Sequence, residues 1–145
     1  MLAKIVSNKI VKKISAWAPV ILWAALIFRF SSGTIPLAST VHWQDFLVKK
    51  VGHILLFGAL AVLIYRGLRM EGVNRKRAAI YAVISAFLYG ASDEYHQMYT
   101  QGRESRMRDV FIDGMGAALI ILAVYQFVPK LSKNIYIILE KLDIT

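Results

Sequence analysis

Four apolar stretches of about 15 to 19 residues each limit the folds open to this chain more than any other feature. They run from about residue 14 to 30, 51 to 65, 78 to 92 and 110 to 128, and charged or turn residues bound each of them. At a rise of about 1.5 Å per residue, helices of this length extend about 22 to 28 Å, close to the hydrocarbon thickness of a bilayer. The pattern predicts an all-α membrane protein, a single bundle of four transmembrane helices.

The composition agrees with an apolar environment for these helices. Hydrophobic residues make up 57% of the 145 residues and the mean hydropathy is +0.52, whereas soluble domains are roughly half apolar. Glycines such as Gly58 and Gly116 stand among bulky residues, as they do in packed membrane helices. The chain has no cysteine, which excludes disulfides, thiolate metal sites and a cysteine nucleophile. We therefore expect one membrane domain over residues 1–145.

The lysines and arginines are unevenly distributed along the chain. Twelve of the 18 precede the first apolar stretch, lie between the second and third, or follow the fourth. By the positive-inside rule, both termini and residues 66–77 are cytoplasmic, and the loops at 31–49 and 93–109 face outward. This topology explains most of the net charge of +9. Nucleic-acid binding is disfavoured, because the basic residues are divided among segments that flank the membrane.

Both ends of the chain carry apolar residues at helical spacing. Residues 1–13 and 130–145 are therefore expected to lie along the inner membrane surface or to extend the adjoining spans. A cleaved secretory signal ending at "PLAST" is disfavoured, because the first apolar stretch is long for a signal and an uncleaved span keeps the basic loops inside. Pro19, near the start of this stretch, is expected in the first turns of its helix, where proline is tolerated.

Ionisable residues gather at the predicted outer ends of the second and fourth spans. Lys50 and His53 are three residues apart at the start of the second span. Asp109 and Asp113 are four apart on the fourth, and Gly116 follows on the same helical face. An aspartate in the membrane costs about 2.5 to 3.5 kcal/mol at the centre and less near the interface. Asp113 should therefore face protein or water and have a partner.

The end of the third span adds further polar residues at the same level. Asp93 is three residues from His96 and four from Gln97, which predicts one shared helical face with Glu94 beside it. Taken alone, Lys50 is typical of an anchor that reaches the interface, and His53 of a hydrated helix end. Asp113 and residues 93–97 indicate either a functional site or an ion-pair network that pins the helix ends.

These motifs resemble the VanZ-like family of small bacterial membrane proteins. The family's pattern joins K-x-x-H at the head of one span to D-E-x-x-Q, a G-R pair and D-x-x-x-N/D-x-x-G in the next outer loop and last span. The matching residues are Lys50, His53, Asp93, Glu94, His96, Gln97, Gly102, Arg103, Asp109, Asp113 and Gly116, together with the serine pair Ser31 and Ser32. The resemblance covers roughly residues 18 to 128. Phe57 and Asp113 stand where the family often has tyrosine and asparagine.

The resemblance implies a multi-pass protein of the bacterial cytoplasmic membrane and low-level resistance to glycopeptides of the teicoplanin type. From the residues themselves, a first hypothesis is that the outer polar residues bind a lipid-linked cell-wall precursor or the glycopeptide itself. Arg103 and Lys50 would receive its anionic group, and the carboxylates and Gln97 its amides and hydroxyls. The complete expected ligand-binding set is Lys50, His53, Asp93, Glu94, Gln97, Arg103, Asp109 and Asp113.

A second hypothesis is a membrane-embedded hydrolase or transferase that acts on a lipid headgroup by acid/base chemistry. The catalytic candidates are His53, Asp93, Glu94, His96 and Asp109, with Ser31 or Ser32 as a nucleophile. The same His, Asp and Glu residues could hold a divalent metal, but no spacing resembles HExxH, so neither a metal nor a cofactor is expected. Ion transport is disfavoured, because charged residues do not meet at the centres of two spans. Membrane lipids are the expected partners, and the oligomeric state stays open.

Overall fold

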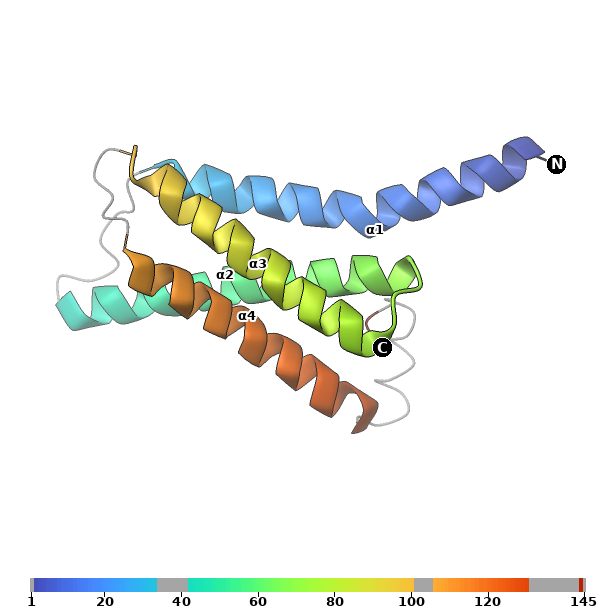
Figure 1. Cartoon of the computed structure of the whole chain (residues 1–145). Coiled ribbons are helices and arrows are strands. Elements are labelled where there is room, and N and C mark those ends of the chain that lie inside the picture. Colours follow the sequence, from blue (N-terminus) through green and yellow to red (C-terminus); the bar gives the residue numbers. More distant parts are fainter. Residues whose placement is uncertain (1, 34–41, 101–105, 131–143, 145) are drawn as a thin grey trace.

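The computed structural model describes residues 2–33, 42–100, 106–130 and 144. This part of the chain consists of helices, turns and bends and contains no strand. Its elements are α1 (Leu2–Ser31), α2 (His42–Met70), α3 (Arg75–Gln97), α4 (Met107–Phe127) and the short 3-10 helix η1 (Val128–Lys130), which Figure 1 shows together. For the part of the chain that the structure describes, the prediction of an all-α fold with four helices at these places is confirmed.

Three of the helices are long and apolar enough to cross a membrane. Their candidate spans are Lys9–Ser31, Phe46–Met70 and Met107–Lys130. α3 is not among them, although it has 23 residues. Three basic residues open α3, and Asp93 and Glu94 lie one turn before its end, which shortens the apolar part between them. Its role as a fourth span, expected over residues 78–92, stays a prediction.

Packing centres on α2, which contacts all three other helices. α2 and α4 share the largest interface, α3 packs against both, and α1 contacts α2 and, over a shorter stretch, α3. Large side chains of α2, such as Phe57 and Leu60, fill the core. α3 instead contributes a buried stripe of small residues four apart, namely Ala78, Ala82, Ala86 and Gly90. Small residues let helices approach closely. The stripe leads to the buried Asp93 and Glu94, so the same packing carries these carboxylates between the helices.

A tight turn joins α2 to α3. Gly72 has φ 86°, in the left-handed region that glycine adopts most readily. Its N–H donates to the Arg69 carbonyl at 2.9 Å, and the Val73 N–H donates to the Leu68 carbonyl at 3.0 Å. This pair of bonds is a Schellman motif, which satisfies the last carbonyls of a helix. The turn makes α2 and α3 antiparallel and brings the start of α2 to the same end of the bundle as the end of α3.

The helix α1 begins at Leu2, so the predicted amphipathic N-terminal segment extends the first span. Pro19 therefore lies inside α1 and not in its first turns, contrary to the expectation from the sequence. A proline leaves the carbonyl four residues earlier without its usual N–H partner. That carbonyl belongs to Ser15, and Arg66 Nη1 donates to it at 2.9 Å. Figure 1 shows α1 bent, with its N-terminal part projecting beyond the other helices.

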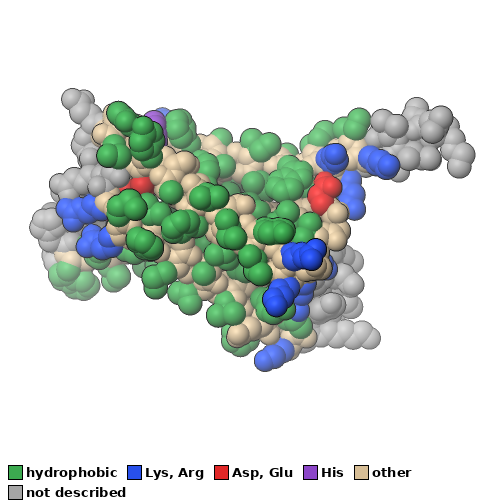
Figure 2. Space-filling model, in the orientation of Figure 1, with side chains coloured by type: hydrophobic (Ala, Val, Ile, Leu, Met, Phe, Trp, Pro, Cys, Tyr) green, Lys and Arg blue, Asp and Glu red, His purple; other side chains and the backbone are tan. Residues whose placement is uncertain are grey.

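The two ends of the bundle contain different parts of the chain. The ends of α1 and α3 and the starts of α2 and α4 lie at one end, which we call the polar end (left in Figure 1). The turn between α2 and α3 and the end of α4 lie at the other, the basic end. Figure 2 shows apolar side chains over the face between them. Most of the predicted amphipathic segment 130–145 lies outside the described residues.

Candidate functional site

A first ion pair joins α2 to α4 at the polar end. Lys50 Nζ lies 2.6 Å from Asp109 Oδ2, and the two side chains are only 15% and 13% exposed. The ammonium group also lies 5.5 Å from the centre of the Phe46 ring, one turn earlier on α2. Asp109 is in the first turn of α4, where a carboxylate interacts favourably with the helix dipole. Lys50 is thus held by α4 at the polar end.

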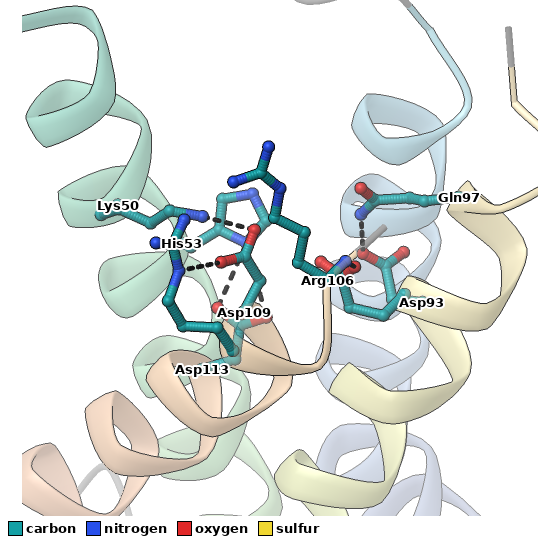
Figure 3. Close-up of polar contacts among 9 residues, drawn as sticks. Lys50, His53, Asp93, Gln97, Arg106, Asp109 and Asp113 are labelled. Carbon is teal, nitrogen blue, oxygen red and sulfur yellow. Dashed lines mark hydrogen bonds and ion pairs between the residues drawn. The ribbon is translucent and has the colours of Figure 1, made fainter. Parts of the chain in front are cut away.

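A second pair lies about one turn deeper on the same two helices. His53 Nδ1 is 3.1 Å from Asp113 Oδ1 and 3.4 Å from Oδ2. Asp113 is 1% exposed, so His53 is the partner that its burial requires. Figure 3 shows the two pairs one above the other between α2 and α4. Both Lys50 and His53 are paired with aspartates, in contrast to the anchoring and hydrated roles that each residue suggests alone.

Glycines bring the helices close enough for these pairs. A Cβ on Gly116 would lie 3.0 Å from the Ile54 Cα, which means that α4 contacts the backbone of α2 at this point. A Cβ on Gly90 of α3 would lie 3.5 Å from the Asp113 Cβ. Asp109, Asp113 and Gly116 therefore share one helical face, as their spacing predicts. This face is turned to α2.

A second group of polar side chains comes from α3. Asp93 Oδ2 accepts a hydrogen bond from Gln97 Nε2 at 2.8 Å, and Glu94 Oε2 accepts one from the backbone N–H of Arg106 at 3.0 Å. Asp93, Glu94 and Gln97 are each 4% exposed. The bond from Arg106 attaches the start of α4 to α3. Among the described residues, two buried carboxylate oxygens, Asp93 Oδ1 and Asp109 Oδ1, find no hydrogen-bond donor.

The two groups interact electrostatically. Asp113 interacts with Lys50 and Asp93 as well as with His53, and His53 interacts with Lys50 and Glu94. The Arg106 side chain lies between the groups in Figure 3. We call the following eight residues the polar cluster: Lys50, His53, Asp93, Glu94, Gln97, Arg106, Asp109 and Asp113.

His96 faces a different neighbour from the one its spacing suggested. Its Nε2 lies 3.2 Å from Ser32 Oγ, and its ring centre lies 4.5 Å from that of Phe28, so it contacts α1. Adjacent residues on a helix are separated by about 100°, so His96 and Gln97 can face different partners. Ser32 Oγ also donates to the Phe28 carbonyl at 2.7 Å. His96 therefore does not join the pair formed by Asp93 and Gln97.

The remaining predicted residues are placed as follows. Ser31 is buried at the end of α1, and its hydroxyl finds no hydrogen-bond partner among the described residues. Arg108 is half exposed, and its Nε lies 3.5 Å from Asp109 Oδ1. Arg103 and Gly102 lie outside the described residues. Among the residues that are described, no three His, Asp or Glu side chains are grouped as a metal site requires.

Sequence reasoning missed the contacts that Arg106 and Phe28 make. The backbone N–H of Arg106 donates to Glu94, and the sequence motifs do not indicate this contact. Its position as the residue before α4 was the available signal, because helix N-termini carry N–H groups that seek acceptors. Phe28 lies one helical turn before Ser32. Because Ser32 was expected near the outer end, the Phe28 ring could also have been expected there.

The polar cluster offers a ligand two kinds of contact. Lys50 and Arg106 supply positive charge at the polar end, and the buried carboxylates supply acceptors. A ligand with an anionic group and several N–H or O–H donors would match both. His53 adds a titratable group whose Nδ1 is engaged by Asp113.

Comparison with known proteins identifies the family. The family model described as VanZ/LLP1 matches residues 14–128, which include the four spans predicted from the sequence and the whole polar cluster. No curated protein and no solved structure matches the chain. The family match agrees with the resemblance found in the motifs, and with the three apolar helices it supports a membrane protein. The chain belongs to the VanZ/LLP1 family.

Proposed function

We propose that the polar cluster binds the headgroup of a lipid-linked cell-wall precursor at the outer surface of the bacterial cytoplasmic membrane. In this proposal the protein is multi-pass, both termini are cytoplasmic and the polar end faces outward. The distribution of lysine and arginine supports this orientation, because twelve of the 18 fall on segments assigned to the inside. Binding of the precursor would contribute to resistance to teicoplanin-type glycopeptides, as family membership suggests.

The observation that carries the proposal is the pair of buried carboxylate oxygens that find no hydrogen-bond donor among the described residues, Asp93 Oδ1 and Asp109 Oδ1, the second of which lies 3.5 Å from Arg108 Nε. A carboxylate can only accept hydrogen bonds, and a buried acceptor without a donor costs about 1 to 3 kcal/mol. A ligand that brings N–H or O–H groups would remove this cost. Sugar hydroxyls and peptide amides, which a cell-wall precursor carries in its headgroup, are donors of this kind.

The cations of the polar cluster extend the match to the anionic part of such a ligand. Lys50 is held within 2.6 Å of Asp109 and is still 15% exposed. Arg106 is exposed, at the start of α4. A phosphate can be bound by a lysine as a point charge and by an arginine through a two-point fork. The carboxylates would then select the sugar and peptide part, and the two cations the phosphate.

Binding can be tested with the purified full-length protein and an undecaprenyl-linked disaccharide-peptide precursor, by native mass spectrometry. We expect Asp93→Asn and Lys50→Gln each to weaken binding by about tenfold, the loss of one charge-assisted hydrogen bond. Lys130→Gln at the basic end is the matched control for loss of a positive charge and should bind normally. Unchanged binding by both polar-end variants would reject the proposal. Precursor analysis and teicoplanin susceptibility of cells carrying Asp93→Asn would show the cellular consequence.

The proposed orientation has its own test, which the absence of native cysteine makes simple. Single cysteines at positions 42, 71 and 104 can be labelled in intact cells with a membrane-impermeant maleimide. Positions 42 and 104 should react from outside, and position 71 only after the membrane is opened. External reaction at position 71 would overturn the orientation without affecting the binding experiment.

The geometry of His53 favours a second candidate, an enzyme that alters the bound headgroup. His53 Nδ1 faces the Asp113 carboxylate, which leaves Nε2 as the nitrogen that can exchange a proton with a substrate. An enzyme should release a changed precursor over time, which liquid chromatography with mass spectrometry would detect. His53→Gln should then abolish turnover and weaken binding much less, because the glutamine amide can still donate to Asp113. A wild-type protein that binds the precursor and never alters it would exclude this candidate.

A further inference from the structure

A groove of about 410 Å³ lies between α3 and α4, away from the polar cluster. Its walls are apolar: α3 contributes Ala79, Ile80 and Val83, and α4 contributes Ala118, Ile121 and Leu122. Ile80 is 48% exposed and Leu122 is 49% exposed. Along α3 the groove runs from residue 76 to residue 84, about 12 Å at the helical rise per residue. An elongated apolar ligand would bury these side chains.

Lys76 lies at the part of the groove nearest the basic end. Lys76 lines the groove and is exposed, and no described residue forms a hydrogen bond or ion pair with it. Its neighbour Arg75 is engaged instead with Tyr125, which also lines the groove: the guanidinium carbon lies 4.5 Å from the ring centre, and Nη2 donates to the Tyr125 carbonyl. Lys76 therefore has no partner in the described part of the chain that would compete with a ligand at this point.

The surroundings of Lys76 favour an anion. Among the described residues, the end of α2, the start of α3 and the end of α4 carry one acidic side chain, Glu71, and six basic ones, which are Arg66, Arg69, Arg75, Lys76, Arg77 and Lys130. Figure 2 shows Lys and Arg side chains gathered at this end of the molecule, beside the apolar face. A ligand that joins an apolar chain to a negative group would match both the groove and its lysine.

We propose that the groove binds an acyl chain of an anionic phospholipid, whose phosphate is held by Lys76 at the membrane surface. A phospholipid has its negative charge at the end of its apolar chains, which is the order of groups along the groove. A lysine near the surface favours an anionic over a neutral lipid by about fivefold. This site lies at the opposite end of the bundle from the polar cluster and does not depend on the function proposed there.

Lipid retention by the purified full-length protein tests the proposal. The protein is mixed with equal amounts of phosphatidylglycerol and phosphatidylcholine that carry identical acyl chains, and bound lipid is counted by native mass spectrometry. We expect about fivefold preference for phosphatidylglycerol, and loss of most of this preference in Lys76→Gln. Lys130→Gln removes the same charge at the same end but outside the groove lining, and it should keep the preference.

A second pair of variants tests the groove itself. Ala118→Phe fills the groove and should lower retention of both lipids, whereas Ala123→Phe places the same ring on an exposed position of α4 outside the lining and should not. Circular dichroism of each variant checks that the helices are intact. Equal retention of the two lipids by the wild type, or equal effects of Lys76→Gln and Lys130→Gln, would overturn the proposal. A dimer that Ala118→Phe dissociates, with lipid retention unchanged, would assign the groove to a second copy of the chain and also overturn it.

Discussion

The two ends of the bundle use positive charge in different ways. At the polar end, Lys50 and His53 face the carboxylates of Asp109 and Asp113, and these pairs lie between helices. At the basic end, arginines donate to backbone carbonyls: Arg66 to Ser15 at 2.9 Å, Arg69 to Val73 at 2.9 Å, and Arg75 to Tyr125. The basic side chains at the polar end form a network with buried acids, whereas these three arginines at the basic end complete the hydrogen bonding of helix ends and a bend.

This difference shows that the role of a charged side chain depends more on its partner than on its charge. A carbonyl at a helix end is satisfied by any donor, including water, so an arginine there contributes mainly to local stability. A buried carboxylate needs a specific donor or cation, and removal of either member of the pair leaves the other unpaired. We therefore expect changes at the polar end to affect stability and binding of the precursor together, and changes of the carbonyl-binding arginines at the basic end to affect stability but not binding of the precursor.

The largest effect is expected for Asp113→Ala. This change leaves His53 without its partner next to a cavity, which should lower the free energy of unfolding in detergent by about 3 kcal/mol. Asp113→Asn keeps the size of the side chain and a hydrogen bond to His53 but removes the negative charge, so it should retain most of the stability. Denaturant unfolding measures both variants. A loss below about 0.5 kcal/mol for the alanine variant would mean that the pair does not hold α2 to α4.

Gly116 near the polar end and Gly67 near the basic end test whether the two ends differ in their effect on binding. A Cβ on Gly116 would lie 3.0 Å from the Ile54 Cα, and one on Gly67 would lie 3.2 Å from the Ala16 carbonyl oxygen. Both contacts involve backbone, so each alanine substitution should cost about 1 to 2 kcal/mol by forcing two helices apart.

The two glycine variants should differ in ligand binding. Gly116→Ala separates α4 from α2 next to both ion pairs, so it should also weaken binding of the cell-wall precursor by about tenfold. Gly67→Ala displaces α1 near Ala16, within the core of the bundle, and should bind normally. Native mass spectrometry with the precursor gives the measurement. Equal losses of binding in the two variants would remove the distinction between the ends.

The sequence predicted the helices and the helical faces but not which faces meet. Spacing alone places Asp109, Asp113 and Gly116 on one face of a helix, and Lys50 and His53 on one face of another. That these faces contact each other depends on α4 packing against α2, two helices that are not consecutive in the chain. The same limit explains His96, because periodicity cannot tell whether its side chain turns to α1 or stays with Asp93 and Gln97. The early start of α1 was one of the two placements expected for residues 1–13, and hydropathy could not choose between them because it reports the part of a helix suited to a membrane and not its whole length.

The smallest effect is expected where Arg66 replaces the hydrogen bond that Pro19 removes. Arg66→Met should lower the free energy of unfolding by about 1 kcal/mol, because the Ser15 carbonyl loses a donor. In a Pro19→Ala background the N–H of residue 19 can donate to that carbonyl, so the same arginine change should cost less than half as much. Denaturant unfolding of the wild type, the two single variants and the double variant gives the coupling between the sites. Equal costs in both backgrounds would show that Arg66 acts through its charge at the membrane surface and not through the Ser15 carbonyl. Positive charge would then stabilise the basic end by electrostatic interaction, as it does the polar end.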